Sequence, residues 1–369
     1  MKQIHIKIND SIHQKLRIQA AEEGVSMQQY VERLLWRNLN MKMDIGSSPK
    51  FIDLFAGIGG IRLPFDELGY ECVFSSEIDK FAQKTYQSYF DEIPAGDITQ
   101  IEPETLPDFD ILLAGFPCQP FSQAGLKKGF MDTRGTMFFY IENIIKIKKP
   151  NVIFLENVKG LRNHDKGRTF KTICNSLEQL GYSVKSTVLA AKDFGLPQHR
   201  ERIYIVAFKD KNKAEQFSFP TPSSIETKVG DILEESVDDK YTISDKLWAG
   251  HQRRKKAHRA KGNGFGYSLF NAYSPYTSTI SARYYKDGSE ILIEQQGKNP
   301  RKITPTEAAR LQGFPDSIVD KARLNGVSDA QLYKQLGNAV AVSVVRAIAK
   351  HIDMALHSAN ANSVSRVVA

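Results

Sequence analysis

The sequence predicts an α/β protein whose large domain is built on a mostly parallel sheet, with one or two small additions. Three apolar runs, residues 51–55, 110–114 and 152–155, are typical of strands buried on both faces. Helical patterns separate these runs, and strands that alternate with helices indicate a parallel sheet. The chain has 369 residues, more than one average domain, and 41% of them are hydrophobic, which is enough for a real core.

A glycine-rich turn, residues 56–60, follows the first strand. The second strand, residues 72–76, ends in Glu77, which lies 20 residues after Gly57. Nucleotide-binding folds place an acid at this distance to bind ribose hydroxyls. The third glycine of the dinucleotide fingerprint is replaced by Arg62. An adenosine ligand without pyrophosphate does not need that close approach to the helix, so the pattern favours S-adenosylmethionine over NAD.

A cysteine, Cys118, lies in a loop between two prolines directly after the strand at residues 110–114. Parallel strands bring their carboxyl ends to the edge of the sheet where ligands bind, so Cys118 is the candidate nucleophile. A packing role, the usual one for a free cysteine, is the alternative. The prolines and the polar residues Gln119 and Ser122 make a poor core segment and favour the nucleophile.

A carboxylate and two arginines are predicted at the same edge. Glu156 follows the strand at residues 152–155, and desolvation there would raise its pKa and suit it to act as an acid. Arg200 and Arg202 enter an alternating strand and are expected on one face. Such a pair is usually a solvated stripe of charge. Beside a thiol and a carboxylate, the two arginines are instead expected to hold an anion and a nucleic-acid base.

Further elements are predicted along the chain. The basic segment 123–135 is interpreted as a lid, with an ordinary surface loop as the alternative. Gln335 is expected to open one apolar helix that runs to about Met354, and the tail from Ser358 is expected to fray. The other predicted helices are 61–68, 136–149, 169–180 and 304–311.

The charge of the chain favours a polyanionic partner. The formal net charge is +8 and the pI is near 9.1. Residues 246–261 carry seven Lys or Arg, two His and no acid, which is typical of phosphate binding, with a bland basic loop as the alternative. No membrane-length apolar stretch or signal-peptide pattern occurs, so we expect a cytoplasmic protein without a membrane partner. Cys72 and Cys174 lie in apolar patterns and predict neither disulfides nor a metal site.

Residues 1–40 are predicted to form a separate module. Alternating isoleucines indicate a short strand, and two helix patterns follow, the second from Ser26. Such a unit cannot bury its own faces and normally dimerises. It resembles the ribbon-helix-helix fold of small bacterial repressors, which implies a homodimer and three base readers, Gln3, His5 and Lys7. A plain dimerisation arm or a helical hairpin is the alternative.

The ordered motifs resemble the bacterial cytosine-5 DNA methyltransferases of restriction-modification systems. The resemblance covers roughly residues 50–355 and leaves out the N-terminal module and the tail. The matching segments are 51–60, 77, 97–98, 115–122, 156–158, 198–202 and 335–340.

This resemblance implies a Rossmann-like class I methyltransferase fold with an inserted target-recognition domain. The implied parts are the module at 1–40, a linker at 41–49, the catalytic domain at 50–209, the target-recognition domain at 210–300, the rest of the catalytic domain at 301–356 and a frayed tail at 357–369. The implied setting is the bacterial cytoplasm at the nucleoid, with a functionally linked restriction endonuclease.

The resemblance also implies a mechanism with S-adenosylmethionine as methyl donor, S-adenosylhomocysteine as product and no metal. The Cys118 thiolate adds to C6 of a cytosine while Glu156 acts on N3, and C5 then takes the methyl group. Arg200 and Arg202 favour the thiolate, and Arg202 holds the cytosine O2. The implied cofactor pocket consists of Phe55, Gly57, Ile58, Gly60, Glu77, Ile78, Asp97, Ile98, Pro117 and Asn338.

The partner implied by the resemblance is double-stranded DNA, from which the target base is flipped out. Residues 281–293 resemble recognition domains that read short GC-rich sites such as CCNGG or GGNCC. A tRNA cytosine methyltransferase and a transcriptional regulator are the alternative functions. The residues expected to contact DNA, besides the three base readers of the N-terminal module, are Gln119, Ser122, Gln198, Arg253, Arg254, Lys255, Lys256, Arg283, Tyr284 and Lys286.

Overall fold

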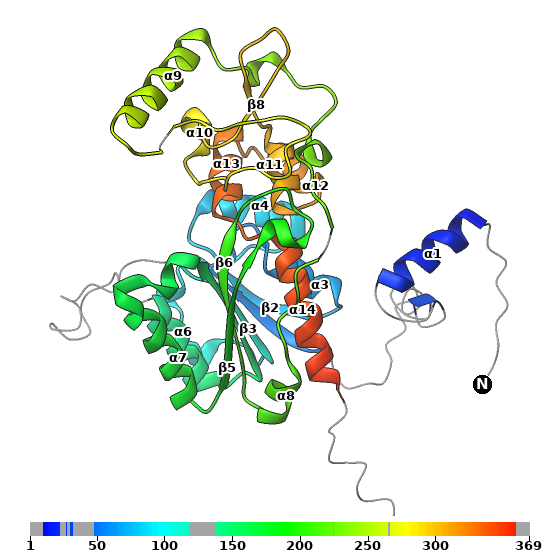
Figure 1. Ribbon diagram of the computed structural model, residues 1–369. Helices are drawn as coiled ribbons and strands as arrows, with labels where there is room; N and C mark the ends of the chain where they lie inside the picture. The colour runs from blue at the N-terminus through cyan, green and yellow to red at the C-terminus, as the bar shows by residue number, and fades with distance from the viewer. Residues whose placement is uncertain are drawn as a thin grey trace, which may run out of the picture. The chain divides into compact units, whose positions relative to one another are not determined.

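A six-stranded sheet, in the order β2-β1-β3-β4-β6-β5, forms the centre of the protein (Figure 1). The first four strands pair in parallel, and β6 runs antiparallel to both β4 and β5. The order reverses between β1 and β3, and ligands of such sheets bind beyond the strand ends at this point. The predicted mostly parallel sheet is confirmed. The strands are β1 (Lys50–Leu54), β2 (Glu71–Ser76), β3 (Ile111–Gly115), β4 (Val152–Val158), β5 (Ser183–Ala190) and β6 (Glu201–Phe208).

The computed structural model describes residues 10–22, 27, 30–31, 48–117, 137–223, 225–264 and 266–358. The chain divides into two compact units, Met1–Ser48 and Pro49–Ala369, and the sheet belongs to the second. The predicted strand of the N-terminal module, the lid and the tail after Ser358 lie outside the described residues, as does Cys118 with Gln119 and Ser122.

Helices cover both faces of the sheet (Figure 1). Alternate residues of each central strand point to opposite faces, as in β1, where Phe51 packs against α3 and α14 while Ile52 and Leu54 pack on the side of α6 and α7. Burial on both faces explains the nearly continuous apolar runs in the sequence. The covering helices are α3 (Arg62–Glu67), α8 (Lys211–Gln216) and α14 (Val342–His357) on one face, and α6 (Met137–Lys148) and α7 (Arg168–Gln179) on the other.

A second hydrophobic core supports a smaller region, and α4 (Lys80–Phe90) packs against it through α12. This core draws residues from both sides of the boundary predicted at residue 300, including Tyr284 and Leu336. Its strands β7, β8 and β9 form a separate small sheet. The elements are β7 (Leu269–Phe270), β8 (Leu292–Ile293), β9 (Arg301–Lys302), α9 (Asp245–Ala260), α10 (Tyr284–Asp287), α11 (Pro305–Gln312), α12 (Ser317–Leu324) and α13 (Asp329–Asn338).

Short 3-10 helices connect the larger elements. They are η1 (Ile98–Gln100), η2 (Pro103–Thr105), η3 (Lys159–Arg162), η4 (His164–Gly167), η5 (Ala191–Phe194), η6 (Val229–Ile232) and η7 (Asp239–Tyr241).

One element prediction needs correction, and one segment without a predicted element proves to be a helix. The single helix expected from Gln335 to Met354 is two helices, because α13 ends at Asn338 and Ala339 is extended, with φ −63° and ψ 159°. The basic segment after residue 245 is a regular helix, α9, capped by the Ser244 side chain. Within α9 only His251 is buried, so the sequence of this helix shows no apolar stripe.

The smaller unit contains α1 (Asp10–Glu22), which agrees with the first helix predicted there. Tyr30, also helical, is buried and donates a hydrogen bond from its hydroxyl to the Gln19 side chain at 2.8 Å.

Candidate active site

The turn after β1 and the acid after β2 are joined by a hydrogen bond. The Gly57 N–H donates to Oε2 of Glu77 at 2.7 Å, and the Asp79 N–H donates to Oε1 at 2.7 Å. Gly57 has φ +56°, and Phe55 adopts the same left-handed value, which is strained for a residue with a side chain. Glu77 thus directly follows β2, and its carboxylate is held by two backbone amides.

Polar and apolar groups flank Glu77 along the edge of the sheet. Oδ1 of Asp97 accepts the Thr99 N–H at 2.9 Å, and its second oxygen has no partner among the described residues. Ile78 is 67% exposed, whereas Ile98 is buried. A free carboxylate oxygen and an exposed apolar face suit a ligand with polar and apolar parts.

The C-terminal segment returns to this edge. A Cβ on Gly60 would come within 2.9 Å of both Phe314 and Val340, so a glycine is needed for the segment after α13 to pack on the turn. Asn338, two residues before Val340, is exposed at the end of α13. The structure thus brings the segment that follows Asn338 against the glycine turn, although Val340 lies 280 positions after Gly60 in the sequence.

Glu156 lies inside β4 rather than after it, because this strand continues to Val158. Its Oε1 lies 3.2 Å from Nε of Arg202, and both side chains are nearly buried. Burial raises the pKa of Glu156, and the charges of Arg202 and Arg200 partly oppose that rise. Gly115 of β3 lies opposite Glu156 in the sheet, three residues before Cys118. A carboxyl with a raised pKa next to this strand end can hold a proton for a reacting group.

The loop that leads to Cys118 is held by the neighbour of Glu156. The Nδ2 of Asn157 donates to the carbonyl oxygen of Phe116 at 2.9 Å, and both residues are buried. Pro117, the next residue, is exposed. The sequence predicts no role for Asn157, because a hydrogen bond from its side chain to a backbone carbonyl leaves no signal in the sequence.

Arg200 and Gln198 lie in the interior. The Arg200 guanidinium is 2% exposed and donates to the carbonyl oxygens of Ile280, Gly337 and Ala339. Burial, more than repulsion from Arg202, lowers the pKa of Arg200 to about 9. Gln198 is fully buried, with both ends of its amide bonded to protein, so its predicted contact with DNA disagrees with its position.

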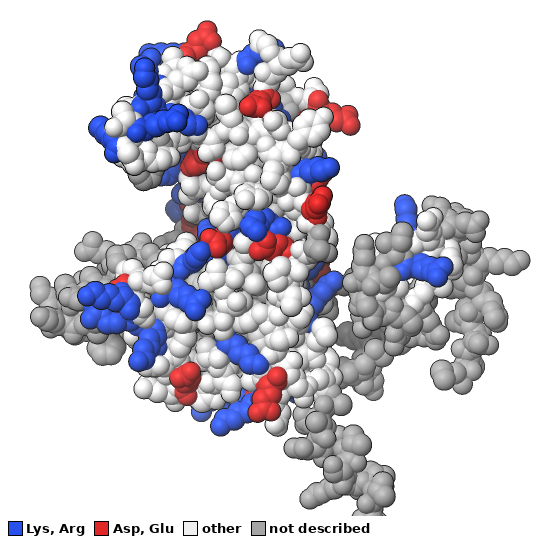
Figure 2. Space-filling model, viewed as in Figure 1, with Lys and Arg blue, Asp and Glu red and all other residues white. Residues whose placement is uncertain are grey.

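The four residues of α9 that were predicted to contact DNA fall into two groups. Arg254 pairs with Asp287 at 3.0 Å, and the Lys255 ammonium donates to the Tyr267 carbonyl at 3.0 Å and lies over its ring. Arg253 and Lys256 are exposed and have no partner among the described residues. Figure 2 shows Lys and Arg gathered over α9 and again over the part of the molecule that carries α7.

The predicted recognition residues after Ile280 also divide. Arg283 and Lys286 are exposed. Tyr284 is fully buried, donates to the Ile291 carbonyl at 2.6 Å and accepts the Ile303 N–H at 2.9 Å. Its predicted contact with DNA is therefore corrected to a core role, because the ring fills the second core and the hydroxyl is already bonded.

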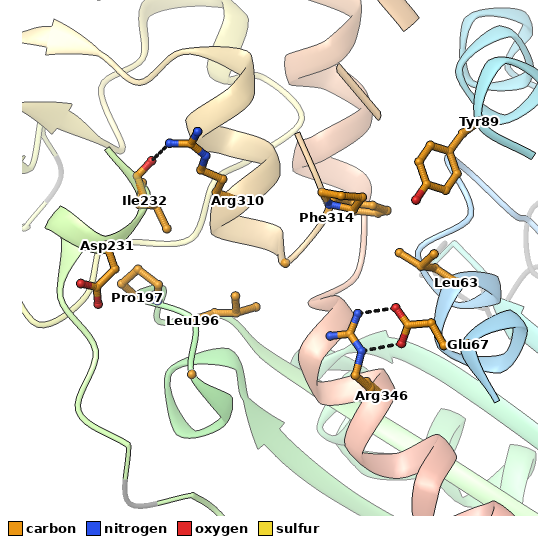
Figure 3. A pocket seen from close by; sticks show the side chains of 13 residues that line it. Leu63, Glu67, Tyr89, Leu196, Pro197, Asp231, Ile232, Arg310, Phe314 and Arg346 are labelled. Atoms are coloured by element: carbon orange, nitrogen blue, oxygen red, sulfur yellow. Dashed lines mark hydrogen bonds and ion pairs between the residues drawn. The ribbon is translucent and has the colours of Figure 1, made fainter. Parts of the chain in front are cut away.

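A pocket of about 580 Å³ is lined by residues other than the predicted site residues (Figure 3). Its walls come from α3 and α14 and from segments of the second core. Arg346 donates to Glu67 across one side at 2.6 and 2.8 Å, and Arg310 donates to the Ile232 carbonyl on the other at 3.3 Å. No predicted site residue lines it. Within the described ranges no group of His, Cys, Asp and Glu could hold a metal ion, and no helix is long and apolar enough to cross a membrane.

The sheet and the residues at its edge define an α/β methyltransferase fold. The chain belongs to the C-5 cytosine-specific DNA methylase family, whose model matches residues 49–354. A second family model, the HicB family, matches residues 2–35.

Related proteins agree with this assignment. The Type II methyltransferase M.NlaX of Neisseria lactamica is 64% identical over 310 residues, which cover 83% of this chain and 97% of the relative. The Type II methyltransferase M.SsoII of Shigella sonnei is 62% identical over 312 residues, covering 84% and 81%. Among solved structures, the Entamoeba histolytica methyltransferase EhMeth has a TM-score of 0.70 at 22% identity, covering 85% of this chain and 100% of that one, and shares the fold.

Proposed function

We propose that the protein methylates C5 of a cytosine flipped out of duplex DNA, with Cys118 as nucleophile, Glu156 as acid and S-adenosylmethionine as methyl donor. The register of β3 and β4 is the observation that carries the proposal. It sets Glu156, with its raised pKa, opposite Gly115 on the strand that leads to Cys118. A nucleophile and an acid that approach one ring from adjacent strands meet the needs of this reaction.

The methyl donor fits the edge formed by β1, β2 and the Asp97 turn. Glu77 would accept the ribose hydroxyls, and the unpartnered oxygen of Asp97 would accept the adenine amino group. The exposed Ile78 would pack on the adenine ring. The remaining residues of the proposed pocket are Phe55, Gly57, Ile58, Gly60, Ile98, Pro117 and Asn338. The donor supplies an activated methyl group on a sulfonium, and no metal is needed.

Three side chains carry the chemistry. The Cys118 sulfur bonds to C6 while Glu156 gives a proton or a hydrogen bond to N3, which places the ring electrons on C5. After C5 has taken the methyl group, its proton leaves to a base such as water and the C6–S bond breaks. Arg202, which contacts Glu156, is also placed to hold the cytosine O2.

Duplex DNA would lie against the basic surfaces of α9 and α7. The support is the set of exposed, unpartnered cations, Arg253 and Lys256 on α9, together with exposed Arg283 and Lys286 near the recognition segment. Lys and Arg at such positions bind phosphates and release counterions. Gln119 and Ser122 are proposed to fill the space left by the flipped base.

The N-terminal unit is proposed to be a ribbon-helix-helix-like module that dimerises and binds DNA through Gln3, His5 and Lys7, which adds autoregulation to methylation. The HicB match over residues 2–35 and the helix α1 support a distinct small module. Deletion of residues 1–40 is expected to relieve repression of a reporter that carries the protein's own promoter and to leave methylation intact. Loss of methylation in that variant would contradict a separate role.

The remaining proposals concern organisation and setting. We assign the catalytic domain to residues 50–209 and 301–356, the target-recognition domain to 210–300 and the linker to 41–49. The protein would act at the nucleoid in the bacterial cytoplasm and protect DNA from a cognate restriction endonuclease. The relatives M.SsoII and M.NlaX, which are Type II methyltransferases, support this setting.

Bisulfite sequencing tests the main proposal. Purified protein and S-adenosylmethionine are expected to leave 5-methylcytosine at one recurring short sequence of a plasmid, and Cys118→Ser is expected to bind the plasmid without methylating it. Full activity of Cys118→Ser would contradict the covalent mechanism. Methylation of tRNA alone by the wild type would contradict the DNA substrate.

A further inference from the structure

Three buried amide and guanidinium side chains join separate segments of the protein, and we call this set the buried junction. It consists of Gln198, Arg200 and Gln312, each at most 2% exposed. They lie where β6 begins, where α11 ends and beside the segment that leads into the recognition residues. Burial of a polar group costs free energy unless the group is hydrogen-bonded, so these side chains stabilise the fold only while their partners stay in place.

The junction holds the main chain of Ile280 from both sides. Oε1 of Gln198 accepts the Ile280 N–H at 3.0 Å, and Nη1 of Arg200 donates to the Ile280 carbonyl at 3.2 Å. Ile280 comes directly before the segment that carries Arg283. The start of the recognition segment is therefore fixed by side chains of another part of the chain.

The same guanidinium caps α13. Nη2 of Arg200 donates to the carbonyls of Gly337 and Ala339, at 3.1 and 2.6 Å, and these residues flank Asn338. Carbonyls at the end of a helix lack intrahelical partners, and an arginine can supply the donors. Gln312 adds a bond from its Nε2 to the Leu336 carbonyl. The helix break after Asn338 is what makes these carbonyls available.

The third connection runs along β6. Arg202, which contacts Glu156, is the second residue of β6 and follows Arg200, which lies directly before this strand, by two residues. Arg200 thus lies two residues from Arg202, the partner of Glu156. Its guanidinium binds the main chain of Ile280, where the recognition segment starts, and the main chain on both sides of Asn338. A displacement of any of the three segments changes the geometry that Arg200 can satisfy.

The packing leaves room for such a displacement. The pocket of Figure 3 adjoins the junction, because Pro197 and Gly313, which line it, are the sequence neighbours of Gln198 and Gln312. The core of the large sheet and the second hydrophobic core are therefore separated by this pocket next to the buried junction. Nε of Arg200 is buried without a partner among the described residues, so its hydrogen bonding is incomplete in this arrangement.

We propose that Arg200 is a positioning residue that couples the recognition segment to the methyl-transfer site, so that a wrong DNA sequence slows the reaction rather than only weakening binding. This inference rests on the proposed function. Lysine cannot replace Arg200, because one ammonium cannot reach three carbonyls of two segments in the geometry of a planar fork. Discrimination of this kind appears in the ratio of kcat/KM values for cognate and altered DNA.

The test compares Arg200→Lys with Arg346→Lys, an arginine of α14 that also makes a two-bond contact but does not touch the junction. The site found by bisulfite sequencing is placed in one duplex, and single base pairs of it are changed in others. Arg200→Lys is expected to lower kcat on the cognate duplex by about tenfold, with the KM for DNA within about threefold. Rates on altered duplexes are expected to change little, so discrimination falls by about tenfold. Arg346→Lys is expected to keep the wild-type ratio.

The outcomes separate the two proposals. Equal loss on cognate and altered duplexes, or no loss, would overturn the coupling and leave the proposed function in place. A wild type that methylates no DNA would overturn both. If Arg200→Lys does not fold in a thermal unfolding check, the ratio is measured for Gln198→Met, which removes the bond to the Ile280 N–H. An unchanged ratio in that variant also overturns the coupling.

Discussion

The Glu156 carboxylate lies 3.2 Å from Nε of Arg202, in a place where neither side chain is more than 15% exposed. A cation this near favours the ionised carboxylate, yet burial is the larger effect and raises the pKa of Glu156. The pair therefore holds a carboxyl that can keep a proton at a higher pH than an exposed glutamate. A buried cation beside it also suits the binding of a carbonyl oxygen.

Glu156→Gln is expected to lower the rate of methyl transfer by about a hundredfold or more, because a neutral amide cannot donate the proton. Since the pKa of Glu156 is raised, its protonated form decreases as the pH rises through that pKa, and the wild-type rate is expected to fall on this limb. The limb is expected to be absent in Glu156→Gln. Single-turnover rates between about pH 5 and 9 measure both effects. Glu178→Gln, an exposed change on α7, serves as the control, and equal rates for Glu156→Gln and wild type would exclude the acid role.

Gly337→Ala is expected to destabilise the protein, because a Cβ there would lie 2.3 Å from the backbone of Ser281. Relief of this clash requires a shift of α13, and we expect a loss of about 1–3 kcal/mol in the free energy of unfolding. Gly250→Ala in α9 is the matched control, since its Cβ would meet only the end of Arg253 at 3.9 Å. That variant is expected to gain about 0.5–1 kcal/mol from helix propensity. Denaturant titrations measure both, and similar changes in the two would contradict the close contact.

Asp53→Asn is expected to change how stability depends on pH. Burial raises the pKa of Asp53 well above its usual value, and neither oxygen has a partner among the described residues. The folded state then holds a proton that the unfolded state releases, so this group's stabilisation is present at low pH and is lost as the pH rises through the folded-state pKa, at up to about 1.4 kcal/mol per pH unit. The stability of Asp53→Asn relative to wild type is expected to rise over the same range. Asp108→Asn, an exposed change, is expected to run parallel to wild type, and a parallel curve for Asp53→Asn would refute its buried protonated state.

Arg253→Ala and Lys256→Ala are each expected to reduce the slope of log K for DNA against log salt by about 1, because each removes one phosphate contact. Arg254→Ala removes the same charge but from a side chain that is paired with Asp287. Its slope is expected to stay closer to wild type. Fluorescence anisotropy of a labelled duplex at several salt concentrations gives the slopes. Three equal slopes would mean that α9 acts only through its net charge.

The fold and the closeness of the Gly57 turn to Glu77 could be predicted because they depend on local patterns. The strands read as apolar runs, and the distance from Gly57 to Glu77 reflects one strand-turn-helix unit of fixed size. The roles of Arg200 and Tyr284 could not, since both depend on partners about 20 to 140 residues away that are backbone atoms or core neighbours. An arginine that binds carbonyls looks the same in a sequence as one that binds a substrate.

The close crossing of Gly337 and Ser281 limits how this protein could be given a new sequence preference. A recognition segment taken from a relative would have to enter through the same backbone path at Ile280 and Ser281, because α13 leaves no space for another. A graft that begins after Ser281 keeps this entrance and can vary freely at exposed positions such as Arg283 and Lys286. A graft that begins earlier has to bring its own version of α13, so the natural unit of exchange is larger than the loop that we propose to meet the DNA.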